Sequence, residues 1–468
     1  MKKALVLATC ICLIFGVQAQ NEQNEKQIDY VHGYSDMYVW PEDSAVVAKL
    51  KHWQDRKFGV LFHWGIYAVK GISESWTICS EDKGFISRGR KRTMDLPYDK
   101  YKEWYWNFSK EFDPVNFEPS EWAKLMKDAG FKYVLFTTKH HDGFCMFDSK
   151  YTDFSIAKGP YKDGKYSNVT KHLFDAFRKE NFMIGAYFSK ADWHSPYYWN
   201  PFWATPTRNQ NYDIKAHPDI WAKFQQFTAN QINELMTDYG RVDVLWLDAG
   251  WVRAPQQDIR IDEIVAKARA KQPGLIVADR TVSGRNENYV TPERKVPETQ
   301  LDYPWESNIP LSGKWGWKPA AKYQPASWVI NTLAEIVAKG GCFALGIGPS
   351  ADGTFDQGIH DCLKKVGAWL KRNGESIYST RTTSNYHSTN TWFTANKDGE
   401  TLYAIYTLDE GKTLPPIIEW EGNEPKGSMI LLQNGKKVEY SVNDGKVTIT
   451  LPEGLKNETL AFKFKVKN

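Results

Sequence analysis

Short apolar runs alternate with amphipathic stretches over the first four-fifths of the chain. The apolar runs predict seven β-strands, at Gly59–Tyr67, Tyr133–His141, Met183–Ser189, Val242–Asp248, Leu275–Asp279, Leu301–Trp305 and Cys342–Ile347. Between the first two runs, Trp122, Leu125, Met126 and Ala129 recur at the spacing of a helix. Repeated βα units of this kind predict an α/β fold, a (β/α)8-type barrel whose active site lies at the C-terminal ends of its strands.

The pattern changes after residue 378. Apolar and polar residues then alternate in short segments such as Leu402–Tyr406, which is typical of half-buried strands. Asn434-Gly435 and Asp444-Gly445 are typical of tight hairpin turns. We therefore predict a catalytic barrel over residues 45–378 and a C-terminal antiparallel β-sandwich over residues 379–468.

Residues 1–20 have the form of a signal peptide. Two lysines are followed by an apolar run that extends to Val17, and Val17-Gln18-Ala19 resembles a small-residue cleavage site. We therefore expect export to the periplasm or the extracellular space, with a polar segment over residues 21–44 leading into the barrel. No other part of the chain approaches the roughly 20 apolar residues that a membrane span needs.

The balance of charge argues against several classes of partner. The chain has 60 basic and 56 acidic residues and a net charge of +4, without a basic block of the kind that binds nucleic acid. The 20 tryptophans suit either sugar stacking or core packing. Cys79, Cys145, Cys342 and Cys362 form no CxxC pair, so we expect buried free thiols rather than disulfides or a zinc site.

Polar residues gather at the ends of the predicted strands. His63, His140 and His141 follow two of them, and Asp248 closes an otherwise apolar strand. A buried carboxylate is costly unless it is paired or reacts, so Asp248 is either a catalytic group or a structural partner of Arg280. A metal site of the two adjacent histidines and the aspartate is a further alternative. It requires the strand to end at His140, because adjacent strand residues point to opposite faces.

Nine segments along the chain form a specific pattern when they are taken together. They are Phe58–Tyr67, Lys139–Cys145, Lys150–Phe154, Gly185–Tyr187, Val244–Asp248, Asp279-Arg280, Trp305-Glu306, Trp315–Trp317 and Gly346–Gly353. In this order they resemble glycoside hydrolase family 29, the α-L-fucosidases. The resemblance covers roughly residues 40–380, and its most specific segment is Lys139–Cys145.

The resemblance implies a retaining exo-hydrolase that removes terminal α-L-fucose through a covalent glycosyl-enzyme intermediate. Such chemistry needs two carboxyl groups about 5–5.5 Å apart, and the match to the family makes Asp248 the nucleophile. By the same match, the residues expected to bind fucose are His63, Trp76, His140, His141, Tyr187, Trp246, Arg280 and Trp315. Trp76 and Trp315 would pack against the C6 methyl group and the apolar face of the sugar. The mechanism uses no metal ion or other cofactor, so the histidines are expected to form hydrogen bonds.

The second carboxyl group, the acid/base, is predicted between Glu287 and Glu306. This stretch holds four glutamates, and we predict Glu293, about a dozen residues after Arg280. Glu298 and Glu287 are the alternatives, whereas Glu306 is expected to be structural, at the end of the sixth strand.

The chain departs from the family pattern in three places. Lys165–Val169 replaces a segment that usually contains Asp-x-Val-Gly, Glu74 and Trp76 are not adjacent, and the insert from Trp193 to His217 is long. These differences concern substrate detail, and the expected partner is a fucosylated glycan or oligosaccharide. Two alternatives stay open, a related exo-glycosidase for galactose-configured sugars and a catalytically inactive fucose-binding protein. The sequence predicts no oligomeric state.

Overall fold

The computed structural model describes residues 37–81 and 84–466. The predicted signal peptide, residues 1–20, and most of the 21–44 segment therefore lie outside the described residues. Within the described ranges, no helix combines the length and the apolar character that crossing a membrane requires.

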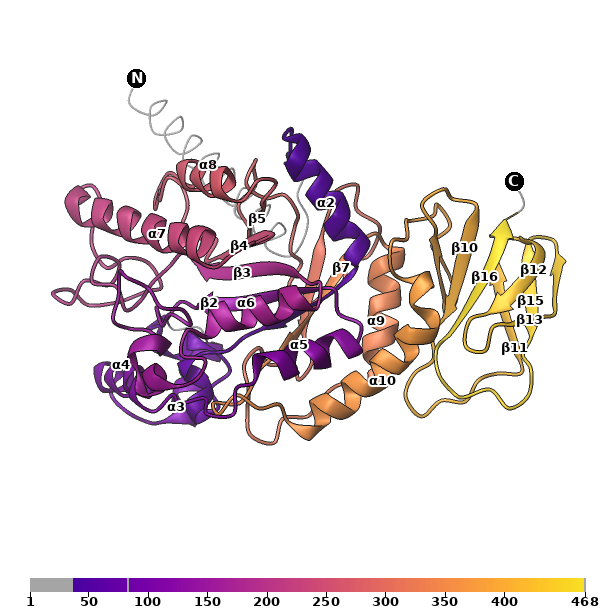
Figure 1. The fold of residues 1–468 in the computed structure, drawn as a ribbon, viewed down its shortest axis with the longest axis horizontal. Helices are drawn as coiled ribbons and strands as arrows, with labels where there is room; N and C mark the ends of the chain where they lie inside the picture. Colours follow the sequence, from indigo (N-terminus) through magenta and orange to yellow (C-terminus); the bar gives the residue numbers. More distant parts are fainter. Residues whose placement is uncertain (1–36, 82–83, 467–468) are drawn as a thin grey trace, which may run out of the picture.

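The first domain is built on a curled sheet of seven parallel strands, with helices packed around it (Figure 1). The strands lie side by side in the order β5-β4-β3-β2-β1-β7-β6. Their bounds are β1 Phe58–Phe62, β2 Tyr133–Lys139, β3 Met183–Ser189, β4 Val244–Asp248, β5 Ile276–Asp279, β6 Glu306–Pro310 and β7 Cys342–Ile347. This arrangement confirms the predicted barrel-type α/β fold.

The α-helices are α2 Ser44–Arg56, α3 Gly84–Thr93, α4 Tyr98–Trp106, α5 Pro119–Asp128, α6 Val169–Lys179, α7 Pro218–Asp238, α8 Ile261–Lys271, α9 Ala326–Ala338 and α10 Gln357–Asn373. Short 3-10 helices cover η1 Ile66–Lys70, η2 Ser75–Ile78, η3 Asn107–Lys110, η4 Ile156–Lys158, η5 Pro160–Asp163 and η6 Gly374–Ser376. Helix α5 shows how the sequence specifies them. Pro119 lies in its first turn, and Trp122 and Met126, one turn apart, are buried, with Trp122 packing on Phe62 of β1.

The sixth strand was predicted in the wrong place. Residues 301–305 form no strand, and β6 begins at Glu306, where it pairs with Cys342 of β7. No apolar run marks this strand in the sequence. Glu306 and Asn308 point to the same face of the strand, and both are polar although they are fully buried. The first two predicted strands were also too long, since β1 ends at Phe62 and β2 at Lys139.

An irregular segment lies between β5 and β6, where a regular barrel has another strand. Residues 287–294 form isolated bridges to both neighbours, Glu287 with Ala278 and Glu293 with Asn308. The Asn308 amide donates to Pro292 at 3.2 Å, and the Arg294 amide donates to the Asn308 carbonyl at 2.9 Å. This segment therefore holds Glu293 beside the edge of the sheet without regular strand pairing.

The second domain consists of two antiparallel sheets, in the orders β13-β12-β16-β10-β9-β8 and β11-β15-β14. Their bounds are β8 His387–Ser388, β9 Thr391–Ala395, β10 Thr401–Tyr406, β11 Ile417–Glu421, β12 Pro425–Leu431, β13 Lys436–Val438, β14 Tyr440–Asn443, β15 Lys446–Thr450 and β16 Leu460–Val466. Asp444 and Gly445 both have positive φ in the turn between β14 and β15. Trp420 of β11 packs on Phe464 of β16, which joins the two sheets as the predicted sandwich requires.

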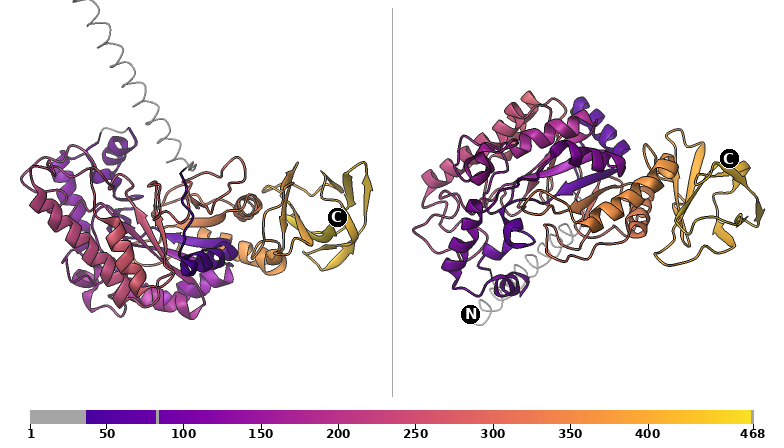
Figure 2. Two further views of the ribbon diagram at one scale, coloured as in Figure 1. Left: turned by 90° about the horizontal axis from the view of Figure 1, so that it is seen from above. Right: turned by 60° about the horizontal axis from the view of Figure 1, so that its bottom comes forward.

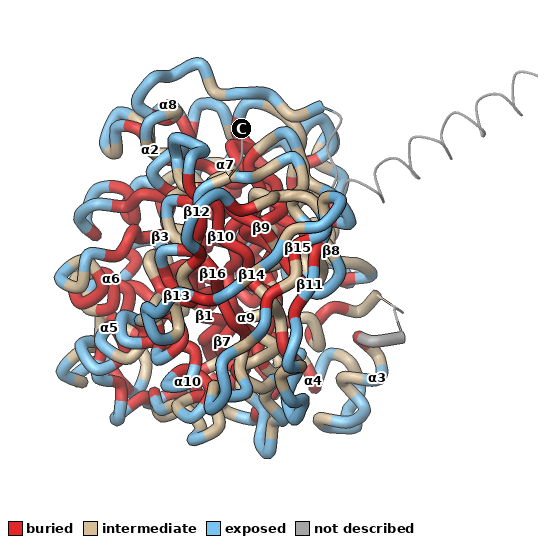
Figure 3. The backbone as a smooth tube through the Cα atoms, turned by 90° about the vertical axis from the view of Figure 1, so that its right-hand side faces the viewer, coloured by how far each residue is buried: buried red, intermediate tan, exposed pale blue. Residues whose placement is uncertain are grey.

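The sandwich packs on α9 and α10, and Figure 2 shows it at one end of the molecule. The Trp369 indole of α10 donates to the Thr459 carbonyl at 2.7 Å, and Ala461 of β16 is buried with the core of the barrel. Buried backbone runs through β10 and β16 when the molecule is viewed from this end (Figure 3). The four predicted thiols are buried and free, as expected.

Candidate active site

A cavity of about 1900 Å³ opens at the C-terminal ends of the barrel strands. Nine of the ten residues predicted for the site line it, and they are His63, Trp76, His140, His141, Trp246, Asp248, Arg280, Glu293 and Trp315. The tenth, Tyr187, lies behind them. Segments that are far apart in the sequence thus meet at one edge of the sheet, which is where barrel enzymes hold their active sites.

Asp248, the predicted nucleophile, is the last residue of β4 and has several polar neighbours. Its Oδ1 accepts a hydrogen bond from Arg280 Nη1 at 2.9 Å, and its Oδ2 accepts one from the Tyr187 hydroxyl. His141 Nε2 lies 3.8 Å from Oδ2. Burial alone would raise the pKa of Asp248, but the Arg280 guanidinium, with help from the other neighbours, holds this pKa well below its usual range. The carboxylate is therefore ionised near neutral pH.

Arg280 contacts both predicted catalytic carboxylates. Its Nη2 donates to Glu293 Oε2 at 2.9 Å, while Nε donates to Thr291 at 3.2 Å. Burial opposes the charge on this guanidinium, yet the two carboxylates raise its pKa overall. Because one planar group bonds to Asp248 and to Glu293, the two carboxyl groups lie close together. Asp248 is 17% exposed and Glu293 is 38% exposed, so Glu293 has the better access to water.

The other three glutamates of this stretch do not line the cavity. Glu298 is exposed. Glu287 is buried, and burial raises its pKa to about 9. Glu306 stands at the start of β6 rather than at the predicted strand end, where it accepts a hydrogen bond from Tyr133 at 2.7 Å, and burial raises its pKa to about 8. Glu293 is therefore the one member of the predicted set that the structure brings to Asp248.

The three histidines of the site are uncharged near neutral pH. Burial lowers the pKa of His63 to about 3 and that of His141 to about 4, and it takes the pKa of His140 well below the usual value. The Ser75 hydroxyl lies 2.6 Å from His140 Nδ1, and the Ser189 hydroxyl lies 2.7 Å from His141 Nδ1. Neutral imidazoles held in this way can donate or accept hydrogen bonds to sugar hydroxyls.

Aromatic rings form much of the remaining wall. Trp315 stacks on His63 with ring centroids 4.8 Å apart, and its indole N–H donates to Glu293 at 3.3 Å. Trp76 packs edge-on against His141 at 5.3 Å. Tyr187 stacks on Trp246 at 4.9 Å, so its ring supports the wall while its hydroxyl contacts Asp248.

His140, His141 and Asp248 also have the composition of a metal site. Their candidate ligand atoms lie within 4.8 Å of one another. Both carboxylate oxygens are engaged by Arg280 and Tyr187, however, and a cation bound there would lie beside a guanidinium. The residues therefore do not fit a metal ion, and hydrogen bonding to a neutral sugar suits them better.

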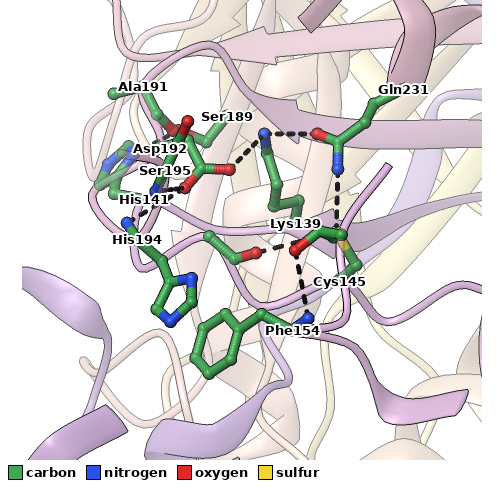
Figure 4. A network of polar contacts seen from close by, with 12 residues as sticks. Lys139, His141, Cys145, Phe154, Ser189, Ala191, Asp192, His194, Ser195 and Gln231 are labelled. Atoms are coloured by element: carbon green, nitrogen blue, oxygen red, sulfur yellow. Dashed lines mark hydrogen bonds and ion pairs between the residues drawn. The ribbon is translucent and has the colours of Figure 1, made fainter. Parts of the chain in front are cut away.

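A buried polar network fixes the backbone beside the histidines (Figure 4). Lys139, the last residue of β2, donates from Nζ to Asp192 at 3.0 Å and to Gln231 of α7 at 2.9 Å. Asp192 also accepts from the backbone amide of Ser195 at 2.8 Å. The Trp193 amide donates to the His141 carbonyl at 2.8 Å, so the loop after β3 is tied to the histidine pair.

Two lining residues were not assigned from the sequence. Burial, followed by the nearby charge of Glu293, raises the pKa of Glu74 to about 7. Asn308 of β6 is fully buried, and neither polar atom of its side chain has a hydrogen-bond partner among the described residues. Its strand was predicted too early in the chain, so the alternation of Glu306 and Asn308 toward the barrel interior was missed. That alternation is the signal that could have found it.

A barrel with two adjoining carboxylates, neutral histidines and tryptophans at its strand ends is the arrangement that a glycoside hydrolase requires. The family model described as alpha-L-fucosidase matches residues 27–375. The chain therefore belongs to the α-L-fucosidase family.

Similar proteins span most of the chain. Human tissue α-L-fucosidase is 29% identical over 386 residues, which cover 78% of this chain and 77% of that protein. The solved structure of α-L-fucosidase isoenzyme 1 from Paenibacillus thiaminolyticus has a TM-score of 0.75 at 27% identity and covers 91% of this chain and all of that one. The Thermotoga maritima α-fucosidase, solved in complex with fucose, has a TM-score of 0.70 at 26% identity and covers 88% of this chain and 96% of that one.

Proposed function

We propose that the protein is an exo-acting, retaining α-L-fucosidase that hydrolyses terminal α-L-fucose from glycans by double displacement. The observation that carries the proposal is the contact of one guanidinium, Arg280, with both Asp248 and Glu293. Retaining glycosidases keep their two carboxyl groups about 5–5.5 Å apart, whereas inverting enzymes separate them further to admit a water molecule. Membership of the α-L-fucosidase family supports the same assignment.

In the first step, Asp248 attacks the anomeric carbon and forms a covalent bond to it. The bond to the leaving oxygen breaks, and Glu293 gives that oxygen a proton, so the remainder of the glycan departs as an alcohol. The low pKa of Asp248 suits this role, because the nucleophile must be ionised before the sugar binds.

In the second step, Glu293 acts as the base. It takes a proton from water while the water oxygen attacks the anomeric carbon and the bond to Asp248 breaks. Fucose is released, and both carboxyl groups return to their starting states. The greater exposure of Glu293 supports this role, since the residue must reach both a leaving group and a water molecule.

The other residues of the site would hold the sugar. His63, His140, His141 and the Trp246 indole N–H would form hydrogen bonds to its hydroxyl groups, and Trp76 and Trp315 would pack against its apolar surface. Arg280 and Tyr187 would orient Asp248. The amide of buried Asn308, which has no hydrogen-bond partner within the described part of the chain, also suits a sugar hydroxyl.

Proton NMR of the first-formed sugar tests the proposal. With 4-nitrophenyl α-L-fucoside as substrate, a retaining enzyme releases α-L-fucose before mutarotation sets in. Initial β-L-fucose would instead show inversion. Faster hydrolysis of a nitrophenyl galactoside would favour the galactose-specific alternative, and fucose binding without hydrolysis would favour the inactive sugar-binding protein.

We also propose that the protein is exported to the periplasm or the extracellular space. The support is the signal-peptide pattern of residues 1–20. N-terminal sequencing of the protein expressed with these residues should give Gln20 as the first residue of the exported form.

A further inference from the structure

The cavity is larger than one fucose needs. Its volume is about 1900 Å³, whereas pockets for single small ligands usually measure about 300–1,000 Å³. Strand-end residues line one part of it. The rest is lined by other segments, among them helix α3 and the loop between β6 and α9. This outer part has room for the portion of the glycan that leaves.

The charges on the cavity wall are strongly unbalanced. Nine basic side chains line it, against three acidic ones, Glu74, Asp248 and Glu293. Some of the basic groups are neutralised by pairing, as Arg208 is with Glu81 at 2.6 Å. Four others, which we call the outer basic wall, form no ion pair with any acidic side chain that the structure describes. They are Arg88, Arg92, Lys314 and Lys318, and all four are exposed.

The outer basic wall comes from two separate segments. Arg88 and Arg92 are four residues apart on α3, so they lie one turn apart on the same side of the helix. Like charges at this spacing destabilise a helix, and a bound anion would relieve that repulsion. Lys314 and Lys318 approach the same cavity from the loop after β6.

An aromatic residue lines the same cavity as these cations. Trp104 of α4 lines the cavity and is only half-buried, although it packs edge-on against Phe108 at 4.6 Å. A partly exposed indole in a cavity that also carries these four cations offers a platform for a sugar ring, and the cations offer partners for an acidic substituent on it.

We infer that the outer basic wall binds an anionic group, a sulfate ester or a sugar carboxylate, on the leaving part of the glycan. The preferred substrates are then acidic fucosylated glycans. This inference rests on the proposed fucosidase function and adds a substrate class to it. Because the four cations are exposed, each contributes modestly, and their joint effect weakens as salt rises.

Matched substrates test the inference. The neutral reference is whichever of three fucosylated trisaccharides, with α-1,2, α-1,3 or α-1,4 linkage, the wild-type enzyme cleaves fastest. It is compared with the same trisaccharide carrying a sulfate on galactose and with the same trisaccharide carrying a sialic acid there. The wild-type enzyme should show a kcat/KM about tenfold higher for at least one acidic substrate at low salt. The substrate that responds distinguishes sulfate from carboxylate as the recognised group.

The variant R88Q/R92Q/K314Q/K318Q should lose this preference. A control, K91Q/K322Q, removes two exposed charges from the same two segments outside the cavity and should keep it. High salt should reduce the preference in the wild-type enzyme.

Two results would overturn the inference. One is a wild-type enzyme that cleaves both acidic substrates no faster than the neutral one. The other is a preference that survives in the quadruple variant. Hydrolysis of 4-nitrophenyl α-L-fucoside and of the neutral trisaccharides separates these results from a failure of the proposed function, because a wild-type enzyme that cleaves none of them is not a fucosidase.

Discussion

Arg280 connects the two carboxylates on which the proposed chemistry depends. Its Nη1 bonds to Asp248 and its Nη2 to Glu293, both at 2.9 Å, while its guanidinium lies 4.5 Å above the Trp246 ring. A lysine cannot reproduce this geometry, since an ammonium is a point charge without a planar fork. The guanidinium therefore keeps Asp248 ionised and holds the carboxylates of Asp248 and Glu293 close together.

Loss of Glu293 should affect substrates according to their leaving groups. Glu293→Ala should slow the hydrolysis of natural glycosides by about 10²-fold or more. It should slow the hydrolysis of 4-nitrophenyl α-L-fucoside far less, because the nitrophenyl leaving group needs little protonation. Azide requires no base, so it should restore turnover of the nitrophenyl substrate and yield fucosyl azide.

The control for this experiment is Glu298→Ala, which removes an exposed glutamate that does not line the cavity. It should leave the kinetics unchanged. If Glu293→Ala behaves like this control and forms no azide product, the acid/base role belongs to another residue.

At the same scale, the sequence predicted some site residues more easily than others. Asp248 stands out because a carboxylate ends an apolar strand, and the histidines stand out by their place at strand ends. Glu293 could only be narrowed to four glutamates, because it lies on an irregular segment that has no periodicity. Asn308 was missed since its strand carries polar residues on its inward face.

At the scale of elements, the buried Lys139 network should hold the loop after β3 against β2. Lys139 and Asp192 are 0% and 2% exposed, so removing the cation leaves a buried carboxylate without its ionic partner. Lys139→Met should lower the free energy of unfolding by about 3 kcal/mol. It should also raise KM for fucosides, because the loop contacts the His141 carbonyl. Urea denaturation and steady-state kinetics measure the two effects.

Lys150→Met is the matched control, because it breaks an ion pair of equal length, 3.0 Å to Asp238, on the exposed surface. It should change neither quantity measurably. Equal effects of the two substitutions would show that the Lys139 network does not position the loop.

The helices and strands were predictable from the sequence where their buried residues are apolar. Strands β3 and β7 were predicted with their observed bounds, because continuous apolar runs marked them at both ends. Helix α5 followed from its apolar stripe and from Pro119. The β5 to β6 region was not predictable, since residues 287–294 bond to both neighbouring strands through isolated bridges that no sequence pattern encodes.

At the scale of the whole molecule, the ionisation of one buried carboxyl group should make the stability of the fold depend on pH. Glu306 is fully buried in the barrel, and burial raises its pKa from 4.5 to about 8. Between these two pH values the folded state holds a proton that the unfolded state has lost. The contribution of Glu306 to the free energy of unfolding is therefore fully present below about pH 4.5 and is lost as the pH rises toward about 8.

Glu306→Gln should remove this loss, because glutamine stays neutral and can still accept the hydrogen bond from Tyr133. Its free energy of unfolding relative to the wild-type protein should rise between pH 5 and pH 8, by about 3 kcal/mol. Urea denaturation at several pH values measures this difference. Glu298→Gln, an exposed control, should run parallel to the wild-type protein, and a parallel course for Glu306→Gln would refute the explanation.

The account as a whole depends on Asp248 forming a covalent bond to fucose, and trapping that intermediate tests it most directly. A 2-fluoro fucosyl fluoride has a good leaving group and a slowed second step, so it should accumulate the fucosyl-enzyme. Peptide mass spectrometry should locate one fluorofucosyl adduct on Asp248 in the wild-type protein and none in a folded Asp248→Ala variant. An adduct on another residue, or hydrolysis without any adduct at Asp248, would contradict the assignment of the nucleophile.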